Sequence, residues 1–448
     1  MKIVRSNEQT EFGRKYNFKS IRSVADFQKN IPIQDYKDVR PFVEKILTGE
    51  QGILTDEKVI LLEPTSGSTG AIKYIPYTQA LKKEFQKGIE AWLFDVYIHN
   101  PWLLFGKSFW SITPREKAEH IAQLKVGFEQ DIQYLGSTAQ YVAKHIMVSV
   151  PDGLTTEEYL EQAYLMLKSE PSLSLISIWS PTFLDCLFRN LDCLPQQQWS
   201  KVRFVSAWGD ASSRQYEFII KKYFPRAKFQ RKGLLSTECM ISFPLERIQN
   251  KSVLSYQSHF FEFLDKEGNI HLAHQLQKGG TYTVIVTTSG GLYRYNTHDD
   301  VQVNGFYHGL PVLEFIGRSN NTGDFFGEKL SESFVSMSCQ QIFEQERIAP
   351  VFFVVIFDKT HYVLLMEADS IDHVSLADKL NLILEKNYHY KNCIRLGQLK
   401  PLTCQPVTGG IQQYTEFYLR KGLKLGDIKI KALDTQFNME GLYGQNRI

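Results

Sequence analysis

Apolar residues follow two different spacings along the first half of the chain, and these spacings predict strands and helices in turn. Residues 59–62 form a short apolar run, which is typical of a buried strand. After Thr78 the apolar positions recur at helical spacing and predict an amphipathic helix; they are Leu81, Phe85, Ile89, Trp92 and Val96. Helices are predicted again at residues 155–167 and 182–191, and strands at 173–179 and 202–207. Such alternation predicts a parallel α/β layer.

Shorter apolar segments precede and follow this layer in the sequence. Apolar patches within residues 8–50 predict short helices packed against a core. From residue 229 onward the apolar stretches shorten, and we expect a more antiparallel region; its predicted strands are residues 257–264, 270–272, 282–288 and 314–318.

The turn-forming sequence SNNTGD at residues 319–324 predicts a linker. After it the pattern predicts helices and strands of a compact α+β unit, at residues 332–343, 351–357, 362–367 and 376–384. A chain of 448 residues also exceeds what one core usually organises. We therefore expect two domains, residues 1–318 and 319–448.

Composition narrows the class of protein. The 51 basic and 49 acidic residues are interspersed and give a formal charge of +2, so nucleic acid and membrane surfaces are disfavoured as partners. The six cysteines contain no CxxC pair and no zinc-ligand spacing, which favours a reducing compartment. Residues 1–14 lack the apolar core of a signal peptide, and the longest apolar run, residues 351–357, is too short to span a bilayer. We expect a cytoplasmic protein.

Residues 63–76, EPTSGSTGAIKYIP, carry the strongest candidate chemistry. They lie between the predicted strand and the predicted helix, so we interpret them as a strand-to-helix loop. Glycines let backbone N–H groups approach an anion, hydroxyls donate hydrogen bonds and Lys73 supplies charge, which favours a nucleoside triphosphate. A Walker loop is disfavoured, because Lys73 comes three residues after Gly70 instead of directly after it. The alternative is an ordinary polar turn with a solvated lysine.

Histidines and tryptophans give no rival site. His271 and His274 are three residues apart, but nothing nearby completes a metal-binding set, and strand geometry would place them on opposite faces. Trp110, Trp179 and Trp208 are interpreted as core residues without a functional role.

Several sequence blocks, in order along nearly the whole chain, resemble one family. They are TEFGR at residues 10–14, EPTSGSTGAIKYIPYT at 63–78, KGLLSTE at 232–238, YRY at 293–295, GEKL at 327–330 and LGDIK at 425–429. The blocks resemble bacterial members of the Gretchen-Hagen-type, auxin-responsive acyl acid amido synthetases, a branch of the adenylate-forming enzymes. The resemblance implies a large N-terminal α/β adenylate-forming domain with mixed sheets and a small mobile α+β C-terminal domain.

The resemblance also implies a two-step reaction. A carboxylate attacks ATP to give an acyl adenylate, and an amine or amino acid then displaces AMP. The first step brings two anions together, so the site has to neutralise charge with Mg²⁺, lysine, arginine and hydroxyl donors. The implied partners are a small carboxylic acid and an amine, without an obligate protein partner. Domain rotation between the two steps is expected.

Roles for the loop and for one carboxylate follow from the same resemblance. The residues assigned to the β- and γ-phosphates are Ser66, Ser68, Thr69 and Lys73, and Gly67 and Gly70 of the same loop are expected to bind the nucleotide. Glu238 is expected to coordinate Mg²⁺, directly or through water, and the alternative is a surface glutamate. The expected catalytic residues are Lys73, Glu238 and Lys429.

The nucleotide's base and sugar are assigned to two further blocks. Ser236 and Thr237 are placed at the nucleotide, and Leu235 stands where an aromatic residue often stacks on adenine, so an apolar contact is expected there. Asp299 is expected to accept hydrogen bonds from both ribose hydroxyls, with Asp300 as the competing carboxylate. His298 occupies a position where glycine is usual, and we interpret it as a residue in a tolerant turn.

Two basic residues complete the implied site. Arg318 is expected to contact ribose or phosphate beside the hinge, and a structural salt bridge is the alternative. Lys429 is expected to reach the α-phosphate and the reacting carboxylate from the C-terminal domain, and a solvated lysine is the alternative.

Other functions stay open at this point. One is a ligase that passes the acyl group to a thiol of coenzyme A or of a carrier protein, and another is a catalytically silent nucleotide-binding protein. The sequence identifies neither the acid nor the amine. The chain starts close to the TEFGR block, so the sequence also leaves open whether an N-terminal helix of longer relatives is missing.

Overall fold

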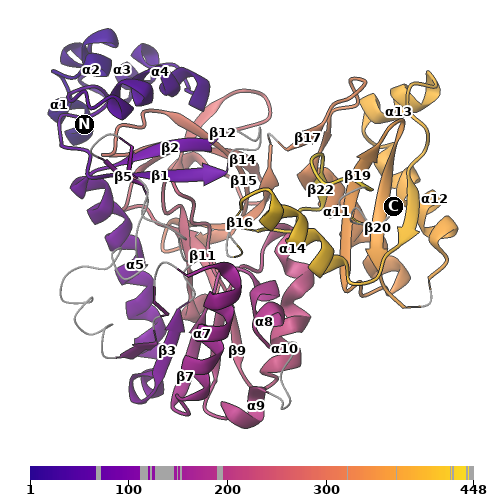
Figure 1. The fold of residues 1–448 in the computed structure, drawn as a ribbon. Coiled ribbons are helices and arrows are strands. Elements are labelled where there is room, and N and C mark those ends of the chain that lie inside the picture. Colours follow the sequence, from indigo (N-terminus) through magenta and orange to yellow (C-terminus); the bar gives the residue numbers. More distant parts are fainter. Residues whose placement is uncertain are drawn as a thin grey trace. The chain divides into compact units, whose positions relative to one another are not determined.

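The computed structural model in Figure 1 forms two compact units, residues Met1–Ser177 with Gln230–Phe315 and residues Ile178–Phe229 with Ile316–Ile448. The predicted domain division after residue 318 stays a prediction. The residues that the structure describes are 1–66, 72–110, 120–121, 124–126, 146–148, 150–151, 154–188, 195–319, 321–369, 371–423, 425, 428–439 and 442.

Short helices begin the first unit, as the sequence predicts. They are α1 (Lys2–Ser6), α2 (Glu11–Lys15), the 3₁₀ helix η1 (Phe18–Ser20), α3 (Val24–Asn30) and α4 (Tyr36–Leu47). Capping boxes on Ser23 and Asp35 start α3 and α4. The ring of Phe12 stacks 4.8 Å from that of Tyr293, so these helices pack on the segment that carries the YRY motif.

Residues 63–66 and 72–76 lie on two paired strands and not in a strand-to-helix loop, which corrects the sequence interpretation; we call this pair of strands the β1–β2 hairpin. Strand β1 (Leu61–Ser66) pairs antiparallel with β2 (Ile72–Tyr77), and Thr65 lies opposite Lys73. Ile75 and Tyr77 of β2 are fully buried in the packed structure. The predicted helix is confirmed as α5 (Gln79–His99).

Two further short strands join this hairpin. Strand β5 (Leu124–Val126) pairs parallel with β1 and antiparallel with β4 (His120–Ile121), which gives the sheet order β2-β1-β5-β4. Helix α5 itself begins where the Thr78 hydroxyl accepts a hydrogen bond from the Leu81 amide at 3.1 Å.

A seven-stranded sheet forms the centre of the first unit and confirms the predicted antiparallel region. Its order is β10-β11-β16-β15-β14-β12-β13. The strands are β10 (Ser242–Leu245), β11 (Lys251–Leu254), β12 (Phe260–Leu264), β13 (Ile270–Leu272), β14 (Thr281–Thr287), β15 (Tyr295–Tyr307) and β16 (Leu310–Arg318). Because side chains alternate along β15, Asp299 is buried on one face while His298 and Asp300 lie on the other.

The predicted parallel layer is confirmed for three strands of the first unit. Strand β3 (Lys107–Trp110), which follows the 3₁₀ helix η2 (Pro101–Phe105), pairs parallel with both β6 (Met147–Val148) and β7 (Leu173–Ser177). All five residues of β7 are buried, as a strand covered on both faces requires. Helix α7 (Thr156–Lys168) starts with the predicted Thr155 and Glu158 capping box.

The second unit begins with α8 (Pro181–Phe188), α9 (Pro195–Gln198), the fully buried β8 (Phe204–Ala207), the 3₁₀ helix η4 (Ala211–Tyr216) and α10 (Glu217–Tyr223). Strand β9 (Lys228–Arg231) spans the boundary between the units.

The C-terminal part of the second unit is the predicted α+β fold. An antiparallel pair, β19 (Phe352–Asp358) and β20 (His361–Glu367), is flanked in parallel by β22 (Leu433–Asp434) and β21 (Thr403–Pro406). Its helices are α11 (Glu332–Glu346), α12 (His373–Leu384), α13 (Tyr388–Arg395) and α14 (Gly410–Arg420). Leucines of α12 and the inner face of β20 share one apolar core. Before α11 in the chain, strands β17 (Thr322–Gly323) and β18 (Leu330–Ser331) pair antiparallel.

None of the helices in the described residues has the length and apolar character needed to cross a membrane.

Candidate nucleotide site

The β1–β2 hairpin holds Lys73 beside the N-terminal helices. The Lys73 Nζ atom lies 5.5 Å from the ring centroid of Tyr36 on α4. The Tyr36 hydroxyl accepts a hydrogen bond from the Tyr74 amide at 2.9 Å, and burial raises the Tyr36 pKa. Ser66 ends β1. Four residues predicted to bind the nucleotide, Gly67, Ser68, Thr69 and Gly70, lie outside the described residues.

A tight turn presents Glu238. Leu235 and Met240 form an isolated antiparallel bridge, and the Ser236 amide donates to the Cys239 carbonyl at 3.0 Å. The Cys239 amide donates back to the Ser236 hydroxyl at 3.3 Å, so Thr237 and Glu238 form the tip. We call residues 235–240 the carboxylate turn. Glu238 is only 6% exposed, which excludes the alternative of a surface glutamate.

One hydrogen bond joins the hairpin to the carboxylate turn. The hydroxyl of Tyr77, the last residue of β2, donates to the Thr237 carbonyl at 2.6 Å. Tyr77 is fully buried, so packing as well as this bond holds its side chain in place. The strand that carries Lys73 and the turn that carries Glu238 are therefore fixed to one another, although 160 residues separate Tyr77 from Thr237.

Asp299 belongs to the same neighbourhood. The pKa of the buried Cys239 thiol is raised well above its ordinary value, first by burial and then by the negative charges of Glu238, Asp299 and Glu84. Each of these carboxylates is thus near enough to the thiol to act on it electrostatically. Asp300 instead accepts a hydrogen bond from the Thr283 hydroxyl at 2.6 Å, and burial raises the pKa of Asp300 to about 6.

His298 shows why the usual glycine is replaceable. Its φ of 60° lies in the left-handed region, where glycine is favoured and histidine is better tolerated than most residues. Its Nε2 atom lies 2.9 Å from Asp35, the N-cap residue of α4.

Arg318 and Lys429 belong to the second unit. Arg318 ends β16. The Lys429 Nζ atom lies 3.9 Å from the centroid of one ring of Trp208, so this lysine stacks on an aromatic face of its own unit. The Tyr414 hydroxyl donates to the Lys429 carbonyl at 3.3 Å. That Arg318 and Lys429 meet the same nucleotide as Lys73 stays a prediction.

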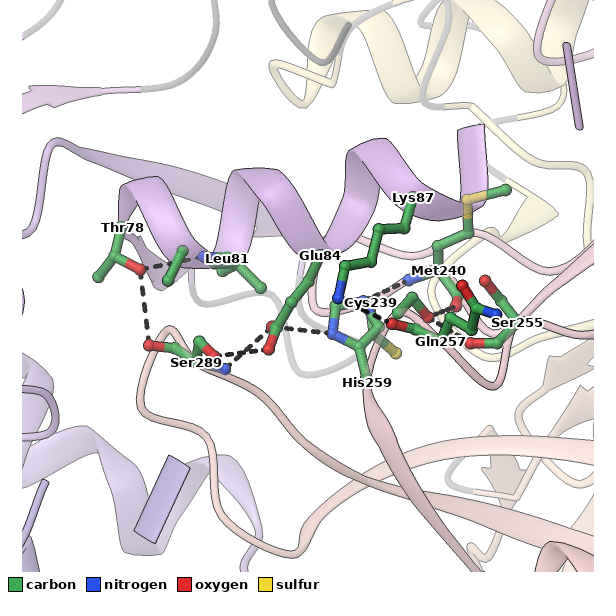
Figure 2. Close-up of polar contacts among 12 residues, drawn as sticks. Thr78, Leu81, Glu84, Lys87, Cys239, Met240, Ser255, Gln257, His259 and Ser289 are labelled. Atoms are coloured by element: carbon green, nitrogen blue, oxygen red, sulfur yellow. Dashed lines mark hydrogen bonds and ion pairs between the residues drawn. The ribbon is translucent and has the colours of Figure 1, made fainter. Parts of the chain in front are cut away.

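The structure also reveals a polar network that the sequence reading missed. Figure 2 shows Glu84 of α5 between His259 and Ser289. A sequence signal existed, because Glu84 occupies the apolar face of α5 between Leu81 and Phe85. His271, by contrast, pairs with Asp265 at 2.7 Å. Among the described residues no group of three or more His, Cys, Asp or Glu side chains is arranged as a metal site.

In a comparison with known proteins, the chain matches two family models. The GH3 family N-terminal domain matches residues 1–192, and the GH3 family central domain matches residues 252–318. The similar proteins include an indole-3-acetic acid-amido synthetase, GH3.15, of Arabidopsis thaliana, which is 23% identical over 70% of this chain and 66% of its own length. A 4-substituted benzoates-glutamate ligase, GH3.12, of the same plant is 21% identical over 95% and 88% of the two chains.

Solved structures show the same fold. The AtGH3.15 acyl acid amido synthetase, solved in complex with 2,4-DB, has a TM-score of 0.82 at 19% identity and covers 98% of this chain and 91% of its own. A 2-hydroxyisobutyryl-CoA ligase in the postadenylation state has a TM-score of 0.60 at 12% identity, with coverage of 90% and 84%. The predicted adenylate-forming fold is thereby confirmed.

Proposed function

The chain belongs to the GH3 family, and on that premise we propose that it is an ATP-dependent acyl acid amido synthetase. It activates a carboxylic acid as an acyl adenylate and transfers the acyl group to an amine or amino acid, with release of AMP. The observation that carries this proposal is the Tyr77–Thr237 hydrogen bond, which fixes the Lys73 strand to the turn bearing Glu238. A cation and a buried carboxylate held in this way suit a metal-bound triphosphate.

Different residues of the first unit bind different parts of ATP. Lys73, which lies opposite Thr65 in the β1–β2 hairpin, binds the β- and γ-phosphates. Asp299 accepts hydrogen bonds from the ribose hydroxyls, because a carboxylate offers two oxygens to two neighbouring donors. Leu235 and Ser236, at the base of the carboxylate turn, lie beside the base and sugar.

Glu238 fits a magnesium ion. Mg²⁺ usually takes one or two carboxylates, with substrate phosphates and water filling its other positions, so a single buried carboxylate suffices. Bound there, the ion would neutralise phosphate charge during adenylation. Glu238 is then the chain's own contribution to that ion, held at the tip of the carboxylate turn.

Lys429 and Arg318 supply positive charge from the second unit. Lys429 neutralises the α-phosphate and the attacking carboxylate during adenylation, and Arg318 contacts ribose or phosphate. An ammonium group on an aromatic face keeps its charge while it is only partly desolvated, which suits a lysine that approaches and withdraws.

We further propose a cytoplasmic location. The five cysteines among the described residues are free thiols, and they are Cys186, Cys239, Cys339, Cys393 and Cys404. Free, mostly buried thiols suit a reducing compartment.

A pyrophosphate-exchange screen over carboxylic acids tests the proposed function. We expect ATP–pyrophosphate exchange that depends on one class of acid, and mass spectrometry should then detect amide conjugates when amino acids are added. Lys73→Met should abolish exchange, whereas Lys83→Met, at an exposed position of α5, should not. Thioester products and no amides would instead support a thiol acceptor. Absence of exchange with every acid would contradict the proposal and favour a silent nucleotide-binding protein.

A further inference from the structure

Glu84 is a carboxylate on the buried face of a helix, and all of its hydrogen bonds leave that helix. The Ser289 hydroxyl donates to Glu84 Oε1 at 2.5 Å, and the Ser289 amide donates to Oε2 at 3.0 Å. His259 Nδ1 lies 3.1 Å from the same Oε2. Figure 2 shows these contacts side by side beneath α5. Because burying a carboxylate without partners is costly, this arrangement is a built network and not a chance contact.

The hydrogen bonds fix the tautomer of His259. The Met240 backbone amide can only donate, and it lies 3.2 Å from His259 Nε2, so Nε2 is the acceptor. The proton of the neutral ring therefore sits on Nδ1 and is donated to Glu84. The His259 side chain is fully buried, between the rings of Phe85 and Phe261, so its orientation is fixed by packing as well.

Met240 is the base of the carboxylate turn, and it is held from several sides. Its amide donates to His259, and its carbonyl accepts from the Ser258 hydroxyl at 3.1 Å. One helical turn after Glu84, Gly88 has no side chain; a Cβ there would lie 2.5 Å from the Met240 sulfur. Helix α5 therefore lies directly against this residue, and Gly88 permits that close approach.

We propose that Glu84 and His259 are positioning residues for Glu238. The path runs from Glu84 through the His259 ring to the Met240 amide, and from there across the bridge with Leu235 to the tip of the turn. The Tyr77–Thr237 bond holds the tip, and the Glu84–His259 pair holds the base. This inference rests on the proposed function, since it assigns Glu238 to the metal-bound triphosphate.

The same carboxylate also fixes a second segment. Ser289 begins the turn before Tyr293 and Arg294, which lead into β15 and Asp299. Glu84 thus holds the segment that leads to the ribose ligand as well as the turn that bears the metal ligand. Partners that orient metal ligands in this way are typically worth about 10- to 100-fold in metal affinity or activity.

The test compares variants of the full-length protein. His259→Phe fills the space between the two aromatic rings but removes both hydrogen bonds. His259→Gln keeps an acceptor near the Met240 amide and should restore part of the effect. The matched control is His271→Phe, which removes another histidine–carboxylate pair, with Asp265, on β13 of the same sheet.

Two measurements are made on each variant. Hydrogen–deuterium exchange of the peptide covering residues 235–241 reports on the carboxylate turn without any substrate. The Mg²⁺ concentration that half-saturates acid-dependent pyrophosphate exchange reports on the metal-bound triphosphate. For His259→Phe we expect faster exchange of this peptide and about a tenfold higher half-saturating Mg²⁺ concentration, with KM for the acid unchanged. His271→Phe should change neither.

Three results would overturn the inference. One is unchanged protection of residues 235–241 in His259→Phe, another is a loosened turn with wild-type Mg²⁺ dependence, and the third is an equal effect in His271→Phe. If the wild type catalyses no exchange with any acid, the proposed function fails by itself. The inference is then decided by the deuterium exchange together with the Mg²⁺ dependence of ATP binding measured by calorimetry.

Discussion

His298 Nε2 lies 2.9 Å from the carboxylate of Asp35, which links the β15 segment next to the candidate ribose ligand to the first turn of α4. Asp35 is the N-cap residue of α4, so the contact with the histidine is made at the start of that helix. A glycine at position 298 would satisfy the left-handed backbone but could not make this contact.

Substitutions of His298 should separate these two contributions. His298→Val loses the contact and places a β-branched residue at φ 60°, so we expect a loss of about 1–2 kcal/mol in the free energy of unfolding, measured by urea denaturation. His298→Gly loses only the partly exposed contact and should cost less. Equal losses in the two variants would show that the backbone conformation is not the cause.

Removal of Arg294 should leave a buried charge. Its Nε atom lies 3.0 Å from Glu262, and both side chains are almost fully buried. Its NH1 group donates to the Gln28 and Ile31 carbonyls at 2.8 and 2.7 Å, so it also ties the N-terminal helices to the central sheet. We expect Arg294→Met to destabilise the protein by about 3–5 kcal/mol in denaturant unfolding.

The double variant is the control for that prediction. In Arg294→Met/Glu262→Met no charge is left without its partner, so its loss should be smaller than that of Arg294→Met alone. A larger, additive loss would contradict the buried-charge explanation.

Asp300 should make stability fall as pH rises. Burial raises its pKa from 3.8 to about 6, with a smaller contribution from Asp299, so the folded protein holds this proton more tightly than the unfolded chain. The resulting stabilisation is complete below pH 4 and is lost as pH rises to about 6. Asp300→Asn keeps an acceptor for Thr283 and should gain on the order of 1–3 kcal/mol relative to wild type at pH 8.

The free energy of unfolding of both proteins, measured between pH 3 and pH 8, shows whether stability falls as pH rises. The opposite case is Asp265, whose pKa is lowered to about 2, mainly by the hydrogen bond with His271. Asp265→Asn should therefore lose stability above pH 4 and approach wild type in acid. If Asp300→Asn showed the same trend as Asp265→Asn, the raised pKa of Asp300 would be refuted.

Asn321 should anchor the entrance of the C-terminal fold. Its side-chain amide donates to the Glu332 carboxylate at 2.7 Å and to the Leu433 backbone carbonyl at 2.8 Å. The backbone carbonyl of Asn321 accepts a hydrogen bond from the backbone amide of Glu332. Glu332 also accepts from the Ala432 amide at 3.2 Å, in the segment that follows Lys429. We expect Asn321→Ala to cost about 1–3 kcal/mol and to speed amide exchange at residues 430–434.

Asn304→Ala is the matched variant, because Asn304 makes its hydrogen bond, to Glu314, on the exposed surface. It should leave amide exchange at residues 430–434 unchanged. Slow exchange in both variants would mean that Asn321 does not hold this segment.

Lys429→Ala should lower acid-dependent pyrophosphate exchange by about 10²- to 10³-fold, because charge stabilisation at the α-phosphate would be lost. The melting temperature should stay close to wild type, since Lys429 is exposed. Lys421→Ala is the control: Lys421 also stacks on an aromatic ring, 4.4 Å from the Phe417 centroid, but carries no predicted role. A wild-type rate in Lys429→Ala would refute the assignment.

Local sequence determined most of the elements of this protein. Helical spacing after Thr78 gave α5, and the Thr155 and Glu158 pattern gave the start of α7. These features depend on residues within a few positions of one another, so a single sequence carries the information. The ordered motifs likewise indicated the family.

Only the tertiary structure decided the hairpin that carries Lys73, the burial of Glu238 and the role of Glu84. Pairing of β1 with β2 overrode the reading of a loop, since burial of Ile75 and Tyr77 depends on what packs above them. The Glu84–His259 pair joins residues 175 positions apart. Nothing in local spacing encodes such a contact, because hydrogen bonds between distant segments form only once the sheet and α5 have packed together.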